Sequence, residues 1–280
     1  MSQIKRAKNE YFFMKDKKAI VTAATSGIGW ASAITLAKEG ATVCICAPQK
    51  DIDRIAELLT KCNADGLDIF AIPYDAFDTE SYKTLFDKAM ERMGGLDILV
   101  NNFGYTVPNL DTDIFHIKYE DYNRFVTVNL ASVIIPTQLA LPLMMQRGGG
   151  SIVNIASIAG AVPDMTEMAY GTSKAAICHI TKMVASQAAP ARIRCNAILP
   201  GLTMTTAVKE VLTEEYKQFF LRHVPLGRAA EPDEIAAAVK YFASDASSFV
   251  TGQLLEVSGG FGTATPLFAD MMAMAVKMQG

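Results

Sequence analysis

The segment Ala19-Ile-Val-Thr-Ala-Ala-Thr-Ser-Gly-Ile-Gly29 decides which fold the sequence predicts. It starts as a short β-rich run and ends where a helical pattern begins, with Gly27 and Gly29 in the turn between them. Such a turn directs backbone N–H groups and the positive end of a helix dipole at a phosphate. The two glycines also permit close approach of a pyrophosphate and close packing of the helix on the sheet. The segment therefore predicts the first strand–helix unit of a dinucleotide-binding domain.

Apolar strand patterns alternate with helical patterns along the rest of the chain. Strands are predicted at residues 19–22, 42–47, 69–73, 98–101, 151–155, 192–199 and 253–257. Helices are predicted at 28–39, 52–61, 80–93, 121–146, 170–189 and 233–243. This alternation indicates βαβ units and a parallel sheet covered on both faces. The expected fold class is α/β, a three-layer doubly wound parallel sheet of Rossmann type in a single domain.

We expect that domain to span residues 18–260, after an N-terminal extension at 1–17. Residues 203–228 carry a helical insertion at 207–221 and are a candidate substrate lid, because long segments after a strand often close over a site. The C-terminal tail, 261–280, is rich in methionine at 271, 272, 274 and 278. Two interpretations stay open for it: a helix packed on the chain's own core, or a flexible apolar surface for a partner subunit or a bulky apolar substrate.

Composition argues against several classes of protein. The chain has 280 residues, 50% of them hydrophobic, and a net charge of −3, which disfavours nucleic acid as a partner. We find no signal peptide and no apolar run long enough for membrane insertion, so a cytoplasmic location is expected. The five cysteines lack zinc-like spacing, and no metal site is expected. Cys44 and Cys46, two apart on one predicted strand, are expected to face opposite sides of the sheet.

Three residues have the chemistry of a proton-transfer site. Tyr170 and Lys174 lie four apart on a predicted helix, so their side chains project from one face. A phenol, with a pKa near ~10, is a poor base at neutral pH, and a fixed positive charge beside it lowers that pKa. Ser157, just after the predicted strand at 151–155, is placed to hydrogen-bond the same reacting oxygen.

The choice between NAD and NADP depends on the end of the second strand. An acidic residue there binds the 2′-hydroxyl of NAD, and an arginine accepts the 2′-phosphate of NADP. The sequence has Ala47-Pro48-Gln49-Lys50, which is neither, and only Lys50 offers a cation. Because a phosphate without a partner is costly to desolvate, we favour NAD over NADP.

In order and spacing, these motifs resemble the short-chain dehydrogenase/reductase family from Lys18 to Gly260. The matching pieces are residues 22–29, Asp75, residues 101–104 (Asn-Asn-Phe-Gly), Asn129, Ser157, Tyr170, Lys174, Pro200, Gly201 and Thr205. The resemblance implies a doubly wound fold, a nicotinamide cofactor and a homotetramer.

The resemblance also implies a role for each matching residue. Tyr170 would be the general acid/base, and Lys174 would hold the nicotinamide ribose and lower the tyrosine pKa. Ser157 would steady the substrate oxygen, and Asn129 would keep a water that relays protons from Lys174. Asp75 would contact the adenine. The implied cofactor-binding residues are Thr22, Ser26, Gly27, Ile28, Gly29, Asp75, Ala76, Asn102, Gly104, Tyr170, Lys174, Pro200, Gly201 and Thr205.

Two positions depart from the family pattern. Ala23 replaces the first glycine of the usual loop and is strained if its backbone needs a positive φ. Phe103 replaces an alanine and is expected near the adenosine or the nicotinamide. Residues 101–104, 193–202, 223–226 and 255–261 resemble bacterial 7α-hydroxysteroid dehydrogenases acting on bile acids. That subgroup often binds NADP through arginines at the positions of Ser26 and Pro48, which this chain lacks.

We therefore expect an NAD(P)-dependent oxidoreductase that interconverts a secondary alcohol and a ketone on a steroid, foremost the 7α-hydroxyl of bile acids. A steroid needs a broad apolar wall, for which the candidates are the methionine tail and Val208, Val211, Leu212, Phe219 and Phe220. Three alternatives stay open. These are a different steroid position (12α or 3α), a catalytically silent nucleotide-binding protein, and a 3-oxoacyl-thioester reductase, which needs cations near the cleft such as Arg147, Lys182 and Arg222.

Overall fold

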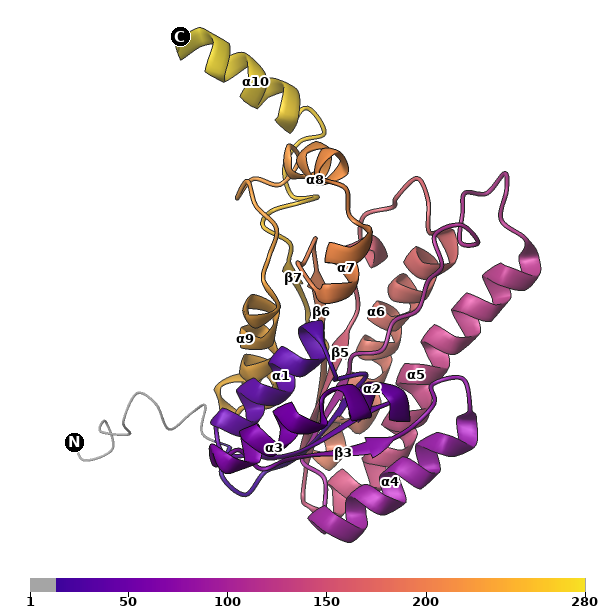
Figure 1. The fold of residues 1–280 in the computed structure, drawn as a ribbon, viewed down its shortest axis with the longest axis vertical. Coiled ribbons are helices and arrows are strands. Elements are labelled where there is room, and N and C mark those ends of the chain that lie inside the picture. The colour runs from indigo at the N-terminus through magenta and orange to yellow at the C-terminus, as the bar shows by residue number, and fades with distance from the viewer. Residues whose placement is uncertain (1–13, 280) are drawn as a thin grey trace, which may run out of the picture.

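The computed structural model describes residues 14–279. Its centre is one parallel sheet of seven strands (Figure 1). The strand order is β3-β2-β1-β4-β5-β6-β7. The strands are β1 (Lys18–Thr22), β2 (Thr42–Ala47), β3 (Ile69–Pro73), β4 (Ile98–Asn101), β5 (Gly150–Ile155), β6 (Ile193–Pro200) and β7 (Leu254–Val257). The order reverses between β1 and β4, and ligands of such sheets bind at the carboxyl ends of the strands beside that point. The predicted fold class is confirmed.

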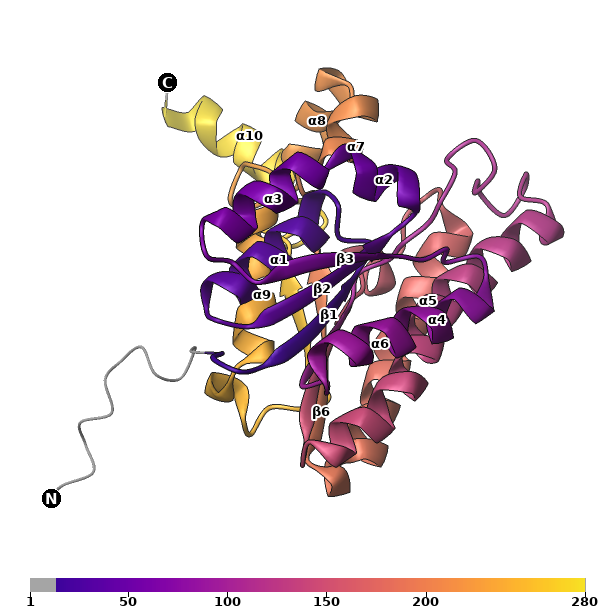
Figure 2. The ribbon, with the colours of Figure 1, turned by 60° about the horizontal axis from the view of Figure 1, so that its bottom comes forward.

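Helices cover both faces of the sheet (Figure 2). On one face lie α1 (Gly27–Lys38) and α9 (Pro232–Ala243), which bury Leu36 and Val239. On the other lie α4 (Thr79–Met93), α5 (Tyr119–Gln146) and α6 (Met168–Ala188). The shorter helices are α2 (Gln49–Arg54), α3 (Ala56–Ala64), α7 (Thr206–Val211), α8 (Glu214–Leu221) and α10 (Phe268–Gln279), with 3-10 turns at Ile158–Gly160, Ala189–Ala191 and Asp245–Ser247.

Two predicted helices are each divided into two. The helix predicted at 52–61 is α2 followed by α3, with the break at Ile55 (φ −107°, ψ 9°). The insertion predicted at 207–221 is α7 followed by α8, because Leu212 is extended at ψ 113°. Thr213 then caps α8, its hydroxyl accepting from Tyr216 N at 3.2 Å. Threonine is a favoured N-cap, so a new helix start competes with continuation of the first.

The expectation that Cys44 and Cys46 face opposite sides of the sheet is wrong. Both are buried in the cluster formed with α4 and α5. Side chains alternate along a strand, so residues two apart share a face. Burial raises the pKa of the Cys44 thiol to about 12. Within residues 14–279, no group of three or more His, Cys, Asp or Glu side chains is placed to hold a metal.

In the part of the chain that is described, α5 alone is long and apolar enough to cross a bilayer. The same helix lies against the sheet and buries Phe125, Val133 and Met144, together with the polar Asn129. A buried core helix has this composition without any membrane.

The methionine tail forms α10, which extends from the domain beyond α8 (Figure 1). Met271, Met272 and Met274 are 57%, 50% and 64% exposed. These exposures contradict a helix packed on the chain's own core and leave the tail as an apolar surface. The Met278 side chain lies outside the described residues, as do residues 1–13 of the predicted N-terminal extension.

Candidate active site

The turn after β1 is tied to the loop after β4 at the switch point of the sheet. Thr22 Oγ1 accepts from Asn102 N at 2.9 Å. Asn102 Nδ2 donates to Thr22 O at 3.1 Å and to Ala23 O at 2.9 Å. Two predicted cofactor residues, Thr22 and Asn102, thus hold the two loops together.

Backbone geometry explains the residue types in this turn. Gly27 has φ +54°, and a Cβ there would lie 3.1 Å from the Thr205 side chain. A Cβ on Gly29 would lie 2.5 Å from Asn102 Nδ2 and 2.7 Å from Ala23 O. Ala23 itself has φ 50°, so the strain expected at this position is present.

Tyr170, Ser157 and Lys174 come together at the carboxyl end of β5. Ser157 begins the 3-10 turn after β5, and its hydroxyl accepts from Ala159 N at 3.1 Å. The Ser157 hydroxyl lies close enough to Tyr170 to lower the pKa of its phenol. Lys174 Nζ lies 5.4 Å from the centroid of the Tyr170 ring and donates to Ile155 O at 2.9 Å.

Burial sets the charge states of this group. Lys174 is 1% exposed, and desolvation lowers the pKa of its ammonium to about 8. Desolvation raises the pKa of Tyr170 to about 12, and the nearby Glu167 carboxylate adds to the rise. The opposing influence is the hydrogen bond with Ser157. In this arrangement the tyrosine pKa is therefore lowered by Ser157 rather than by Lys174, which is directed at the Ile155 carbonyl.

Asn129 and an aspartate that the sequence did not reveal complete the polar framework. Asn129 is fully buried on α5 and exchanges two hydrogen bonds with the Tyr105 backbone, at 2.8 Å and 2.9 Å. Asp111, equally buried, accepts from Ala169 N at 2.7 Å and from Tyr170 N at 2.8 Å. No motif singled out Asp111, because its partners are 58 and 59 residues away in the chain.

The geometry fits a dinucleotide along this edge of the sheet. A Cβ on Gly104 would lie 3.2 Å from Lys174 Nζ and 3.7 Å from the Tyr170 ring, so glycine keeps space beside both. At Gly201 a Cβ would lie 2.8 Å from Ser258 Cα. The other predicted cofactor residues lie at or after the carboxyl ends of β1, β3 and β6, at the same edge: Ser26, Ile28, Asp75, Ala76, Pro200 and Thr205. The Phe103 ring contacts Phe77, at 6.3 Å between centroids, on the side of Asp75 and Ala76.

An apolar cavity of about 410 Å³ adjoins Ser157 through its neighbour Ile158. Phe220 and Phe261 stack there at 4.7 Å between ring centroids, with 15° between their planes. Of the predicted wall, Phe219 and Phe220 line the cavity, as does Phe268 at the start of α10. Val208 and Leu212 lie outside its lining, and the Val211 side chain is not among those described.

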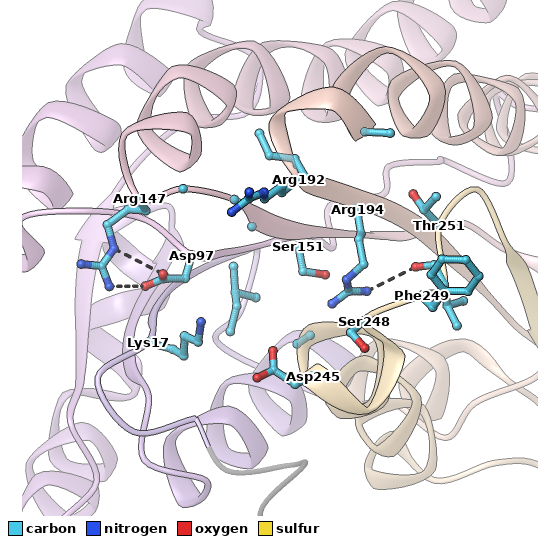
Figure 3. A pocket seen from close by; sticks show the side chains of 18 residues that line it. Lys17, Asp97, Arg147, Ser151, Arg192, Arg194, Asp245, Ser248, Phe249 and Thr251 are labelled. Carbon is cyan, nitrogen blue, oxygen red and sulfur yellow. Dashed lines mark hydrogen bonds and ion pairs between the residues drawn. The ribbon is translucent and has the colours of Figure 1, made fainter.

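A second cavity, of about 610 Å³, lies at the opposite edge, where β4, β5 and β6 begin (Figure 3). Arg147 points to Asp97 there, with Nη2 and Oδ2 3.1 Å apart. Arg194 donates to Ser247 Oγ and Phe242 O. The expectation that Arg147 lies near the cleft is therefore wrong, because the residue lies shortly before β5 and hence at the amino edge of the sheet.

Known proteins are similar to this chain in sequence and in fold. A protein-family profile described as enoyl-(acyl carrier protein) reductase matches residues 22–262. The 7α-hydroxysteroid dehydrogenase of Clostridium sardiniense is 43% identical over 257 residues, which cover 92% of this chain and 97% of that protein. The chain belongs to the short-chain dehydrogenase/reductase family. A family member from Thermotoga maritima, a 3-oxoacyl-[acyl-carrier-protein] reductase, is 35% identical, covering 88% of this chain and 98% of its own.

Within the same family, one solved structure is a 7α-hydroxysteroid dehydrogenase complexed with NADH and 7-oxo glycochenodeoxycholic acid. It matches with a TM-score of 0.84 and 35% identity, covering 90% of this chain and 96% of that one. The protein is accordingly a short-chain oxidoreductase that uses a nicotinamide nucleotide.

Proposed function

We propose that this short-chain dehydrogenase interconverts a secondary alcohol and a ketone on a steroid, foremost the 7α-hydroxyl of bile acids. The observation that carries the proposal is the aromatic cavity of about 410 Å³, whose lining includes Ile158, the residue that follows Ser157 in the chain. A fused apolar ring system needs such a broad apolar wall with a few polar groups at one end. The name of the 43%-identical Clostridium relative supports the same substrate class.

In the proposed reaction Tyr170 is the general acid/base. For oxidation the phenolate accepts the proton of the substrate hydroxyl, and for reduction the phenol returns it. Ser157, which lies close to Tyr170, orients the substrate oxygen beside the phenol. The nicotinamide, when bound, supplies the hydride chemistry.

Lys174 and Asn129 support Tyr170 in this proposal. An ammonium has three donors, and one of them is directed at Ile155 O, so two are free to hold the ribose hydroxyls. With the ribose held in this way, the positive charge of the Lys174 ammonium favours the phenolate of Tyr170, an influence that the cofactor-free arrangement lacks. Asn129 anchors the Tyr105 backbone. In the proposal, Asn129 also keeps a water that relays protons from Lys174.

We infer NAD as the favoured cofactor from charges at the start of α2. Asp51 and Asp53 lie just after β2, near where a 2′-phosphate would be held. Arg54 is paired with Asp51, and Gln49 donates to Asp53. The arginine of α2 is thus already paired, and a 2′-phosphate needs a partner that a 2′-hydroxyl does not. The same proposal treats residues 203–228, with α7 and α8, as the substrate lid and the assembly as a homotetramer.

Reduction of a 3-oxoacyl thioester is the second candidate, and the Thermotoga maritima relative supports it. An acyl carrier protein is acidic and needs cations beside the cleft. Arg147 lies at the opposite edge of the sheet, and Arg222 lies over the Phe219 ring at 5.2 Å. The position of Arg147 favours the steroid over the carrier-bound acyl chain, whereas Arg222 stays beside the cavity that Phe219 lines.

Absorbance of the reduced nicotinamide tests the proposal directly. The protein is mixed with cholate, chenodeoxycholate, deoxycholate or ursodeoxycholate, each with NAD and with NADP. We expect turnover of cholate and chenodeoxycholate with NAD, and none with deoxycholate. Turnover of deoxycholate and cholate alone would assign the 12α position instead. Tyr170→Phe should abolish turnover while nicotinamide binding persists, and turnover retained by this variant would refute the role of Tyr170.

A further inference from the structure

The first turn of α6, which carries Tyr170, is held from outside by a single loop residue and its neighbour. Asp111 Oδ1 accepts from Ala169 N at 2.7 Å, and Asp111 Oδ2 accepts from Tyr170 N at 2.8 Å. The two preceding N–H groups donate to the same segment. Glu167 N donates to Asp111 O at 3.1 Å, and Met168 N donates to Thr112 O at 3.3 Å.

This external cap replaces the local one. The first N–H groups of a helix have no partner within it, and an N-cap side chain in extended conformation usually accepts from one of them. The N-cap residue here is Glu167, which lies in the left-handed region at φ 55°. Its backbone turns the chain into α6, and Asp111 supplies the acceptors. A carboxylate at a helix N-terminus is further favoured by the helix dipole.

Asp111 also connects Tyr170 to the loop that follows β4. Thr106 Oγ1 donates to Asp111 Oδ2 at 3.2 Å. The preceding residue, Tyr105, is fixed by its two hydrogen bonds with Asn129. Asp111 is fully buried, so its carboxylate is held among these donors rather than by water. One continuous set of bonds therefore runs from Asn129 on α5 to the backbone of Tyr170 on α6.

We propose that Asp111 is a positioning residue that fixes the Tyr170 phenol relative to Ser157 and Lys174. The proposal rests on the role assigned to Tyr170 above. Tyr170 is the third residue of α6, so its side chain leaves the helix from the turn that Asp111 holds. If that turn frays or rotates, the phenol moves while Lys174, one turn further along, stays in place. Asp111 thus controls the rate of the chemical step and has little influence on cofactor affinity.

Asp111→Asn is the test, because the amide keeps the shape but loses the charge and one acceptor. A misplacement of the reacting group by about 1 Å lowers a rate by roughly 100-fold. We therefore expect kcat, calculated for the fraction of protein that binds cofactor, to fall roughly 10- to 100-fold. The dissociation constant of the reduced nicotinamide should change by less than about threefold. Amide hydrogen exchange should quicken at Ala169 and Tyr170.

Asp97→Asn is the matched control. Asp97 is also buried, accepts from a backbone N–H (Lys18 N, 2.9 Å) and lies at the opposite edge of the sheet. Both variants should lose stability, and only Asp111→Asn should lose kcat. Equal kcat in Asp111→Asn and the wild type, with quickened exchange at Tyr170, would leave Asp111 a structural cap and overturn the proposal.

Two further outcomes are informative. If Asp111→Asn does not fold, Thr106→Val carries the test by removing one donor to Asp111. A loss in kcat of roughly two- to fivefold, less than the full worth of one hydrogen bond to a carboxylate, would then support the proposal. Unchanged kcat and exchange would overturn it. If the wild type is inactive on every steroid, the proposed substrate is refuted. If amide exchange at Ala169 and Tyr170 is equally slow in the wild type and in Asp111→Asn, the hydrogen bonds to Asp111 are refuted.

Discussion

Replacing Lys174 by methionine should make the cofactor-free protein more stable at neutral pH while abolishing turnover. Lys174 is buried with its ammonium on the Ile155 carbonyl. Desolvation lowers its pKa from 10.5 to about 8 in the folded state. A lysine protonated in a place that disfavours its charge destabilises the fold. Methionine has a similar length and carries no charge to desolvate.

The magnitude follows from the shift in the Lys174 pKa. Below pH 8 the side chain is charged in both states, and the folded state bears the whole penalty, about 3 kcal/mol for a shift from 10.5 to about 8. Methionine cannot donate to the Ile155 carbonyl, and the loss of this hydrogen bond offsets about 1 kcal/mol of the stability gained. We therefore expect Lys174→Met to raise the unfolding free energy at pH 7 by about 2 kcal/mol.

The pH dependence of the stability difference separates the effect of the Lys174 charge from the effect of packing. Between pH 8 and 10.5 the unfolded state binds more protons at Lys174, so the wild type gains stability with rising pH. The advantage of Lys174→Met should shrink by about 2–3 kcal/mol between pH 7 and pH 10. Urea unfolding of both proteins at the two pH values, without cofactor, measures it. A constant difference between them, or a variant less stable at pH 7, would refute the reasoning.

Two further substitutions test the site and its loop. Ser157→Ala removes the hydrogen bond that lowers the pKa of Tyr170, so the rise of the oxidation rate with pH should move to higher pH. A pH–rate profile identical to that of the wild type would contradict this role of Ser157. Ala23→Gly relieves a residue at φ 50° and should stabilise the protein by about 0.5–1 kcal/mol, the left-handed penalty less the entropy of glycine. Thermal unfolding measures it, and a lower midpoint for the variant would show that Ala23 is not strained.

The strands and long helices were predictable because burial imposes a period on them. Residues 42–47, 69–73 and 98–101 were assigned as strands with the bounds that the structure has, since each is a short apolar run in a sheet covered on both faces. The divided helices were missed because their breaks depend on one residue each. At Leu212 and Thr213 an apolar pattern continues across a cap, and periodicity does not detect a cap.

The position of Arg147 was available from the sequence and was misjudged. Chain order alone places a residue just before β5 at the amino edge of a parallel sheet, and the dinucleotide lies at the carboxyl edge. The ion pair of Arg147 with Asp97, which directly precedes β4, follows the same rule. Strand order shows whether a charged residue lies at the amino or the carboxyl edge of the sheet. It is therefore a stronger guide to which charges share a site than closeness to a motif in the sequence.

Asp111 marks the limit of motif reasoning about this site. Tyr170 and Lys174 are four residues apart, and helix geometry alone puts them on one face. The orientation of that helix at its first turn depends on a carboxylate 59 residues earlier in the chain, which only the folded backbone brings to Tyr170 N. Sequence reasoning thus finds the groups that we propose react, because their chemistry needs particular residue types. It misses the residues that position those groups, because any buried hydrogen-bond acceptor in the right place can serve as a positioning residue. In a family whose members act on different substrates, such acceptors are where the geometry of the site can be adjusted.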